Sequence, residues 1–416
     1  MRSAADEGRI TIDWEHEEYV WLDPREVLRD PRRDEVYVPR LYDSLARVYP
    51  EGGDLSATAA GRRLAEGLEQ LASDHESGAR QLADIALRVF RDVLSLFPPD
   101  DLSRVDGREG WWSRVRLVAW HLWKNGRESM GASVVNALMA VLVDLESVVH
   151  DRSDQDHVLG VIDTQIQRRA GTTARLYGAF GAYVRRVVQD RADRTLRILT
   201  LSASSTVRGC LLRVGDLELG LDLRILESRP LYEGMSMAAS LLSGLGPSDD
   251  RSPRVHITIY TDASAALAAT DVDLILLGAD RISADGAVSN KTGSLPAVLS
   301  ARHACPSSKV VVLSELDKVA EPGEAVRGHV IEECDPAEVM KAWRAGGVHG
   351  VDVIDDALRR GENSRATLDV KNVYFEWVTP ELIDTYLCEE GVRTVSDIQQ
   401  HSTWVGSQIE RFFGDL

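Results

Sequence analysis

Lysine is the scarcest charged residue of this chain. The 416 residues include 48 basic side chains, only six of them lysines and 42 of them arginines, against 66 acidic ones. The formal net charge of -18 and the pI near 5.1 disfavour unaided binding to nucleic acid or to an anionic membrane. The excess of arginine fits either a GC-rich genome or an acidic surface adapted to high salt, and neither indicates a function.

Cysteine and long apolar runs are also scarce. The four cysteines form no C-x-x-C pair and stand at no metal-ligand spacing from a histidine, so neither a disulfide framework nor a zinc site is expected. No cofactor is indicated. The first 30 residues hold no apolar run long enough for a signal peptide, and no later stretch reaches about 18 uncharged apolar residues. We therefore expect a soluble, cytoplasmic protein without a metal and without membrane contact.

The length allows two or three domains, and three zones of the sequence differ in texture. Residues 1–50 are acidic and aromatic, and they alternate like an edge strand before a helix start at Asp23-Pro24. Residues 51–192 are predicted to form a helical domain. Residues 193–416 are predicted to form an α/β domain.

The first zone resembles the last strand and helix of Nudix hydrolase domains. The residues that carry the resemblance are Trp14, His16, Glu17, Tyr19, Trp21, Pro24 and Glu26. The Gly- and Glu-rich metal-binding helix of those enzymes is absent from the whole sequence. Nudix hydrolysis is therefore not expected, and a truncated or decayed fusion is the plainer interpretation.

The second zone has apolar residues three and four positions apart, which predicts amphipathic helices. Residues 79–97 and 132–149 show the pattern most clearly. A cluster of four tryptophans in this zone is interpreted as core or interface packing rather than a ligand cage. These tryptophans are Trp111, Trp112, Trp120 and Trp123.

The third zone has short apolar runs that alternate with helical stretches. The runs lie at 197–201, 222–228, 255–260, 272–280 and 309–314. Continuous apolar strands between helices indicate a parallel sheet covered on both faces, which is a doubly wound, Rossmann-like α/β domain. Ligands bind such sheets at the carboxyl ends of the strands, so the residues after each run are the candidate site.

The first two strand ends carry hydroxyl groups and a guanidinium. Ser202, Ser204, Ser205 and Thr206 precede a predicted helix, and they fit either a phosphate cradle or an ordinary helix N-cap. Arg229 follows the next strand. Its guanidinium suits phosphate or carboxylate recognition, but it could equally clamp Glu227 or Glu233.

The later strand ends carry a carboxylate and an ammonium group. Asp280 ends the apolar run "LILLGAD", where partial desolvation favours acid/base chemistry, although an aspartate there could also fix a loop. Asn290 and Lys291 precede a helix start at Ser294. The ammonium and the helix start could share one phosphate there.

Four ordered motifs resemble the superfamily that joins the α, β and δ subunits of translation initiation factor 2B to two sugar-phosphate isomerases. They are "ESRPLYEG", "GADRI", "NKTGS" and the segment 370–392, "VKNVYFEWVTPELIDTYLCEEGV". The similarity runs from about residue 60 to the C-terminus. The segment "NGRESMGASVVNAL" resembles a further family motif, "A-R-P-T", with Arg127 retained and Glu128 in place of proline.

The resemblance implies ligand-binding roles for Arg127, Arg229, Asn290 and Lys291, and an acid/base role for Asp280. The isomerases pair that aspartate with a cysteine in "T-H-C-x-[AS]". Here Leu201 and Ser202 stand at the histidine and cysteine positions, and a serine hydroxyl is far less acidic than a thiol. Cys210, about two helical turns farther along, is not expected to replace it.

Three functions remain open. The first is a factor-2B-like regulatory protein that binds a phosphorylated sugar or nucleotide between its domains. It would self-associate into a homo-oligomer, of the dimer or hexamer-of-dimers type, and translation initiation factor 2 would be a further partner. The second is an aldose–ketose isomerase of ribose 1,5-bisphosphate or methylthioribose 1-phosphate type that uses Asp280, and the third is an assembly subunit with a vestigial pocket.

Overall fold

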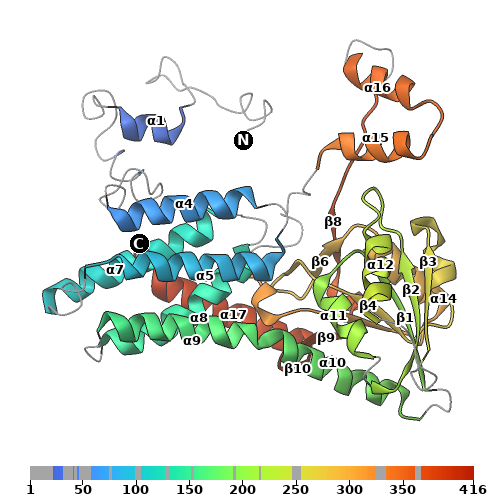
Figure 1. Ribbon diagram of the computed structural model, residues 1–416, viewed down its shortest axis with the longest axis horizontal. Coiled ribbons are helices and arrows are strands. Elements are labelled where there is room, and N and C mark those ends of the chain that lie inside the picture. Colours follow the sequence, from blue (N-terminus) through green and yellow to red (C-terminus); the bar gives the residue numbers. More distant parts are fainter. Residues whose placement is uncertain are drawn as a thin grey trace.

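The computed structural model describes residues 22–30, 41, 45, 58–74, 77–98, 105–126, 131–150, 154–190, 194–214, 217–245, 254–323, 334–360 and 367–416. The Nudix-like strand lies outside the described residues. The predicted helix start at Pro24 is confirmed by α1 (Pro24–Arg29). The rest forms a helical layer beside an α/β layer (Figure 1).

Five helices and the C-terminal helix build the core of the helical layer. The five are α4 (Ala59–Ser73), α5 (Ala79–Ser95), α7 (Val105–Lys124), α8 (Gly131–His150) and α9 (Gln155–Ala170). Trp111 is 1% exposed, and its ring meets Phe97 edge-on at 6.2 Å, which confirms its packing role. Among the described helices only α8 is apolar and long enough to cross a membrane. Of its 18-residue apolar window, 67% is buried inside the protein, as expected of a core helix.

A seven-stranded sheet forms the centre of the α/β layer, with the order β10-β9-β7-β4-β1-β2-β3. All its pairings are parallel except β9 with β10. Five strands match the predicted apolar runs: β1 (Thr195–Leu201), β2 (Gly220–Leu226), β3 (Val255–Tyr260), β4 (Leu274–Leu277) and β7 (Lys309–Leu313). The edge strand β10 (Gly391–Arg393) and its neighbour β9 (Thr385–Cys388) were not predicted.

Helices cover both faces of this sheet, which confirms the doubly wound α/β fold. One face packs against α10 (Thr172–Val188), α11 (Ser205–Val214) and α12 (Glu233–Leu245). The other packs against α13 (Ala265–Ala268), α14 (Ser294–Ala304) and the start of α17 (Val395–Phe413). Alternate residues of β1 enter the two cores, Ile198 on the first face and Leu199 on the second.

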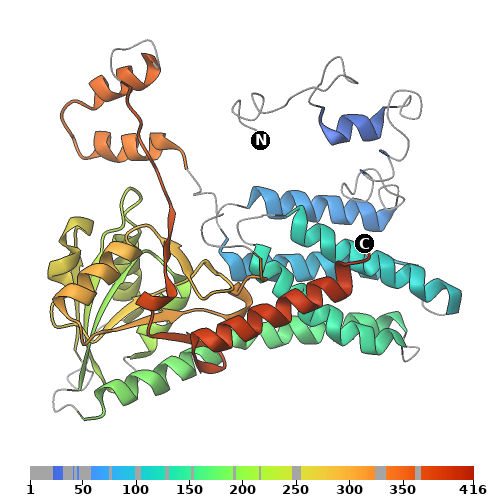
Figure 2. The same ribbon diagram turned by 180° about the vertical axis from the view of Figure 1, so that it is seen from behind.

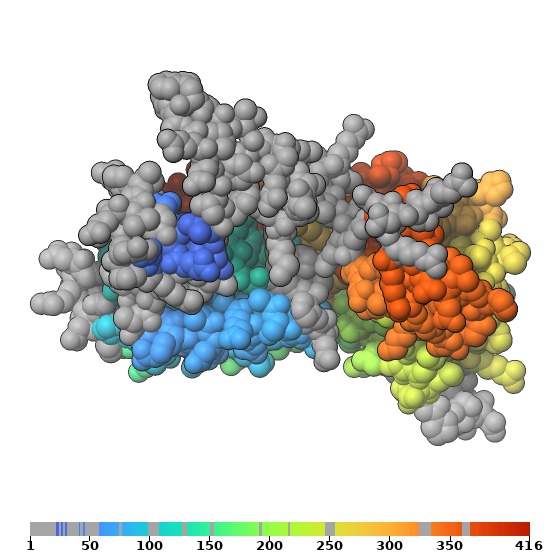
Figure 3. Space-filling model, turned by 90° about the horizontal axis from the view of Figure 1, so that it is seen from above, coloured from blue at the N-terminus to red at the C-terminus, as the bar shows by residue number. Residues whose placement is uncertain are grey.

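A second, antiparallel sheet lies beside the ends of these strands. It has the order β5-β6-β8, formed by β5 (Arg281–Ile282), β6 (Val288–Lys291) and β8 (Phe375–Val378). Between β7 and β8 the chain forms α15 (Pro336–Ala345) and α16 (Val351–Arg360). Figures 1 and 2 show this helical pair standing away from both layers, and Figure 3 shows it from above, over the α/β layer.

The last helix joins the two layers. α17 starts against the α/β core, where Ile398 is buried, and ends in the helical core with Phe412 and Phe413 (Figure 2). Its first turn has a capping box, in which Thr394 and Asp397 exchange hydrogen bonds with each other's backbone. The helix therefore fixes the relative position of the layers.

Candidate functional site

The carboxyl ends of β1 and β4 are neighbours at the point where the chain changes sides of the sheet. β1 continues into α11 on one face, whereas the chain after β4 leads to α14 on the other. In doubly wound sheets such a reversal leaves a crevice at the strand ends, where ligands bind. Residues 202–205 follow β1 and residues 278–280 follow β4, so two of the predicted motifs meet at this reversal of the strand order.

Ser204, Gly278 and Asn290 lie in direct proximity. A Cβ atom at Gly278 would stand 3.1 Å from Ser204 Oγ and 3.5 Å from Asn290 Oδ1. Ser204 Oγ also accepts the backbone N–H of Val207 at 3.3 Å, so it caps α11. Ser205, the first residue of that helix, is exposed. The ordinary N-cap is therefore present, and the capping hydroxyl faces the end of β4.

Ser202, at the position of the isomerase cysteine, is held through its backbone. Its φ is 65°, in the left-handed region, and its N–H donates to Ser228 Oγ at 2.8 Å. The N–H groups of Ser228 and Arg229 each donate to a carboxylate oxygen of Asp262 at 2.8 Å. These bonds tie together the ends of β1, β2 and β3. Asp262 was not predicted, although its place directly after an apolar strand was a usable signal.

Asp280 lies at the mouth of β4, as predicted, and is half-buried. Its N–H donates to Ser289 O at 2.9 Å, which fixes the backbone that carries the carboxylate. The neighbouring Ala279 O accepts Lys318 Nζ at 2.6 Å. Lys318 Nζ is in turn 3.8 Å from Glu315 Oε2, and Glu315 is only 2% exposed. This charged pair follows β7 and was not predicted from the sequence.

Asn290 and Lys291 end β6 and are 6% and 8% exposed. Asn290 Nδ2 donates to Ser294 Oγ at 2.9 Å. Lys291 Nζ lies 3.1 Å from Glu233 Oε2, the carboxylate that begins α12. The ammonium therefore has an anionic partner within the protein.

The start of α14 also has an anionic partner. Glu376 Oε1 accepts the N–H of Gly293 at 2.6 Å and the N–H of Leu295 at 2.9 Å. A carboxylate at a helix N-terminus interacts favourably with the free N–H groups and the helix dipole. The predicted shared phosphate site at Lys291 and this helix start is thus filled by two carboxylates of the chain itself.

Of the two arginines predicted to bind a ligand, only Arg229 lies in the part of the chain that the structure describes. Arg229 is 53% exposed, and its Nε donates to Glu227 Oε1 at 2.9 Å, which is one of the alternatives that the sequence left open. Arg127 and Glu128 lie outside the described residues. The next described residue, Gly131, begins α8.

Cys210 does not replace the isomerase cysteine. It is buried on α11, and burial raises the pKa of its thiol far above the ordinary value, to which Glu315 adds. The reactive thiolate is therefore disfavoured. All four cysteines are free. Across the described ranges, no three His, Cys, Asp or Glu side chains gather where they could hold a metal ion.

The helical layer reaches the site through the short helix η6 (Leu316–Lys318). Asn136 Nδ2 on α8 donates to Asp317 O at 3.0 Å and to Val319 O at 2.9 Å. The guanidinium of Arg169, at the end of α9, pairs with two carboxylates. It lies 2.8 Å from Asp317 Oδ2 and 2.9 Å from Asp84 Oδ1. Both contacts are buried or half-buried, so the layers meet at a polar junction beside the end of β4.

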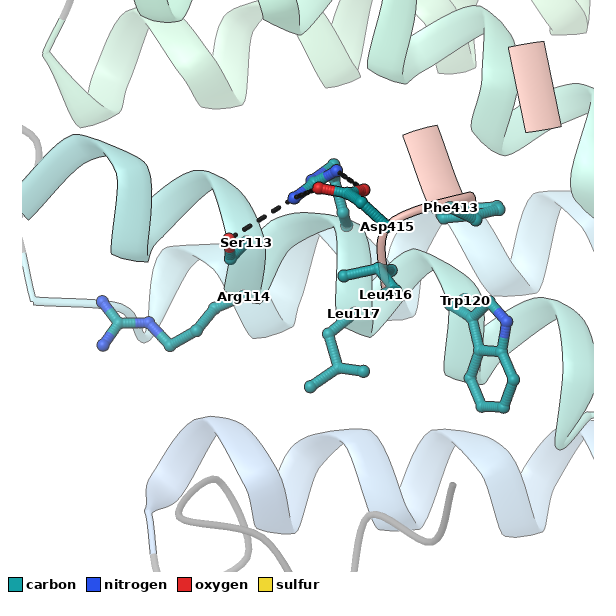
Figure 4. A pocket seen from close by; sticks show the side chains of 8 residues that line it. Ser113, Arg114, Leu117, Trp120, Phe413, Asp415 and Leu416 are labelled. Carbon is teal, nitrogen blue, oxygen red and sulfur yellow. Dashed lines mark hydrogen bonds and ion pairs between the residues drawn. The ribbon is translucent and has the colours of Figure 1, made fainter. Parts of the chain in front are cut away.

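A pocket of about 380 Å³ lies elsewhere, in the helical layer. Figure 4 shows its lining side chains, which come from α7 and from the C-terminal residues. They are Ser113, Arg114, Arg116, Leu117, Trp120, Phe413, Asp415 and Leu416. Arg116 is already paired with Asp415, and none of the predicted site residues lines this pocket.

Comparison with known proteins identifies relatives of two kinds. Methylthioribose-1-phosphate isomerase of Aspergillus fumigatus is 34% identical over 196 residues, 45% of this chain and 46% of that protein. The chain thus spans about half the length of that relative. Ribose 1,5-bisphosphate isomerase of Haloferax volcanii is 27% identical over 76% of this chain and 83% of that protein.

Solved structures of similar fold include the translation initiation factor eIF-2B of Pyrococcus horikoshii. It covers 81% of this chain and 99% of its own, with a TM-score of 0.53 and 20% identity, which is evidence of a shared fold. The family model described as the initiation factor 2 subunit family matches residues 128–395. That match includes the ends of both β1 and β4, and it confirms the resemblance seen in the motifs. The chain belongs to the initiation factor 2 subunit family.

Proposed function

We propose that this protein binds a phosphorylated sugar or nucleotide at the carboxyl ends of β1 and β4, beside the junction of its two layers, and acts as a regulatory member of its family. The observation that carries the proposal is the convergence of Ser204, Gly278 and Asn290. A Cβ atom placed on Gly278 would lie 3.1 Å from Ser204 Oγ and 3.5 Å from Asn290 Oδ1. Hydroxyl, amide and backbone N–H groups at the ends of parallel strands are suited to holding phosphate and sugar oxygens.

Binding without turnover is the role that the chemistry of the site favours. Isomerisation of a sugar 1-phosphate requires ring opening and a proton transfer between two carbons, so an acid and a base must act together. Asp280 can supply one of them. Ser202 offers only an alcohol at the second position, and the buried Cys210 is held as a thiol. Translation initiation factor 2 is the macromolecular partner that this proposal implies.

An isomerase is the second candidate, because one observation favours it. Asp280 keeps a fixed backbone at the mouth of β4, bonded to Ser289 O at 2.9 Å, and the curated relatives named above are isomerases. In this reading Asp280 is the acid/base group, and a substrate hydroxyl or a water molecule takes the place of the cysteine.

Phosphorus and proton NMR of the purified protein with methylthioribose 1-phosphate and ribose 1,5-bisphosphate separates the candidates. Line broadening or shifts without a new product are expected for a binding protein. Ketose that accumulates with the native chain and not with Asp280→Asn would overturn the regulatory proposal in favour of the isomerase. Silence from both ligands would leave an assembly subunit with a vestigial pocket.

Self-association through the α/β layer and a cytoplasmic location belong to the same proposal. Large apolar side chains are exposed on this layer, among them Leu242 at 63% and Leu267 at 69%. Four free cysteines fit a reducing compartment. Sedimentation velocity should show a homo-oligomer, and a monomer at micromolar concentration would contradict the expectation.

A further inference from the structure

The pocket of the helical layer is lined mainly by apolar side chains. Ser113, Leu117 and Trp120 lie three or four positions apart on α7, so they share one face of that helix. Phe413 and Leu416, from the end of α17 and the residues after it, complete the apolar lining (Figure 4). The volume of about 380 Å³ is within the range of small-molecule sites. The pocket shares no residue with the strand ends of the candidate site.

A guanidinium–carboxylate pair also lines this pocket. Arg116 Nη1 lies 2.5 Å from Asp415 Oδ1, and Arg116 Nη2 lies 3.2 Å from Asp415 Oδ2. Arg116 Nη1 also donates to Phe412 O at 3.2 Å. Two parallel N–H···O bonds are the geometry in which a guanidinium binds carboxylates in general. The pocket therefore already contains the contact that recognises a carboxylate.

The two partners of this pair differ in burial. The side chain of Arg116 is 11% exposed and that of Asp415 is 67% exposed. Arg116 Nε is buried and has no hydrogen-bond partner among the described residues. A largely buried guanidinium requires an anionic partner, whereas an exposed carboxylate loses little when it moves into water. The hydrogen bond from Arg116 lowers the pKa of the Asp415 carboxyl, so the pair is ionised at neutral pH. The guanidinium is thus held in place, and its carboxylate can be replaced.

The charges at the pocket favour a ligand with a single carboxylate. Arg114 also lines the pocket, but its guanidinium lies 5.3 Å from the ring centroid of Phe97 and has further interactions, so we assign the ligand anion to Arg116. A ligand carboxylate that replaces Asp415 leaves the charge beside Arg116 unchanged. An uncharged ligand leaves the ion pair intact and contacts only the apolar walls.

We propose that this pocket is a second ligand site, which binds a small molecule with an aromatic body and one carboxylate group. The ligand carboxylate displaces Asp415 from Arg116. The aromatic body packs against Leu117, Trp120 and Phe413, where ring–ring contacts add to the burial of apolar surface. Because α17 packs into both layers, a ligand at its end contacts the helix that joins them.

The test compares naphthalene-2-carboxylate with its uncharged amide, naphthalene-2-carboxamide, by isothermal titration calorimetry at low salt. The native chain should bind the carboxylate at least about 10-fold more tightly than the amide. Arg116→Gln should abolish this preference. Asp415→Asn removes the competing carboxylate and keeps Arg116, so it should bind the carboxylate probe about 3-fold more tightly than the native chain does. Its affinity for the amide should not change.

Asp92→Asn is the matched control. Asp92 is an exposed aspartate of the same layer, paired with Arg63 at 2.9 Å, and it does not line the pocket. This substitution should leave both affinities unchanged, and thermal unfolding verifies that each variant is folded. Equal affinity of the native chain for the two probes, no gain in Asp415→Asn, or no binding of either probe would overturn the proposal. Each of these results leaves the proposed sugar-phosphate site intact, because the two sites share no residue.

Discussion

Replacing Glu389 by glutamine should stabilise the protein, and more so at high pH. Glu389 follows β9, and its Oε2 accepts the N–H of Leu316 at 3.2 Å. Burial raises the pKa of this carboxyl from 4.5 to about 7, with further contributions from Asp317 and Glu315. Above that pH the folded protein must hold an extra negative charge beside two other acids at the junction of the layers.

The sign and size of the effect follow from proton linkage. An acid whose pKa is higher in the folded than in the unfolded state makes the free energy of unfolding fall as pH rises from about 4.5 to about 7. At about 1.4 kcal/mol per pKa unit, the full difference amounts to about 3 kcal/mol, of which about 2 kcal/mol is already lost at pH 6. A glutamine retains a carbonyl oxygen for the N–H of Leu316 and does not ionise.

Urea unfolding of the native chain and Glu389→Gln at pH 6 and pH 8 measures this difference. The variant should be more stable at both, and its advantage should grow by about 1 kcal/mol between them. Glu390→Gln is the control, since Glu390 is the neighbouring residue and is 58% exposed beside Arg393. An advantage that stays constant with pH, or that Glu390→Gln reproduces, would refute the assignment of the raised pKa to the burial of Glu389.

Three further substitutions test the site and its supports. Gly278→Ala places a methyl group 3.1 Å from Ser204 Oγ, so it should weaken sugar-phosphate binding in calorimetry and cost about 1–3 kcal/mol in urea unfolding. Arg169→Met leaves the buried carboxylate of Asp317 without its guanidinium and should destabilise the protein by about 3–5 kcal/mol, measured in the same way. Glu338→Gln weakens the contacts that join α15 to the segment before β8, so hydrogen exchange should rise in α15 and α16 but not in the central sheet.

The central sheet was predictable because its strands are buried on both faces. All four residues of β4 are buried, and so are four of the five in β7, so each strand reads as a continuous apolar run. The small antiparallel sheet was missed for the opposite reason. β6 reads Val-Ser-Asn-Lys, and its polar side chains are buried by tertiary contacts with β8 that no local pattern indicates.

The places of single residues in the candidate site could be predicted from the sequence better than the ion pairs that these residues form. Asp280 could be placed from the strand ends alone, since the carboxyl ends of parallel strands share one edge. Asn290 lies in β6 of the antiparallel sheet, so its proximity to Gly278 depends on how the two sheets meet. The partner of Arg229 could not be predicted, because Glu227 and Glu233 are both within reach in the sequence. The structure pairs Arg229 with Glu227 and gives Glu233 to Lys291, a residue of the other sheet. That choice depends on how the two sheets meet, which is a tertiary property.

The junction between the layers constrains how a ligand can enter. Asn136 bridges to the carbonyls of Asp317 and Val319, and Arg169 joins Asp317 to α5. Separating the two layers by domain rotation would therefore leave several buried polar groups without partners. Each such loss costs about 1–3 kcal/mol. Rotation of the Glu233 side chain breaks a single ion pair that is partly exposed to water, which costs much less. Access is therefore expected through side-chain movement at the start of α12, with the two layers held in place.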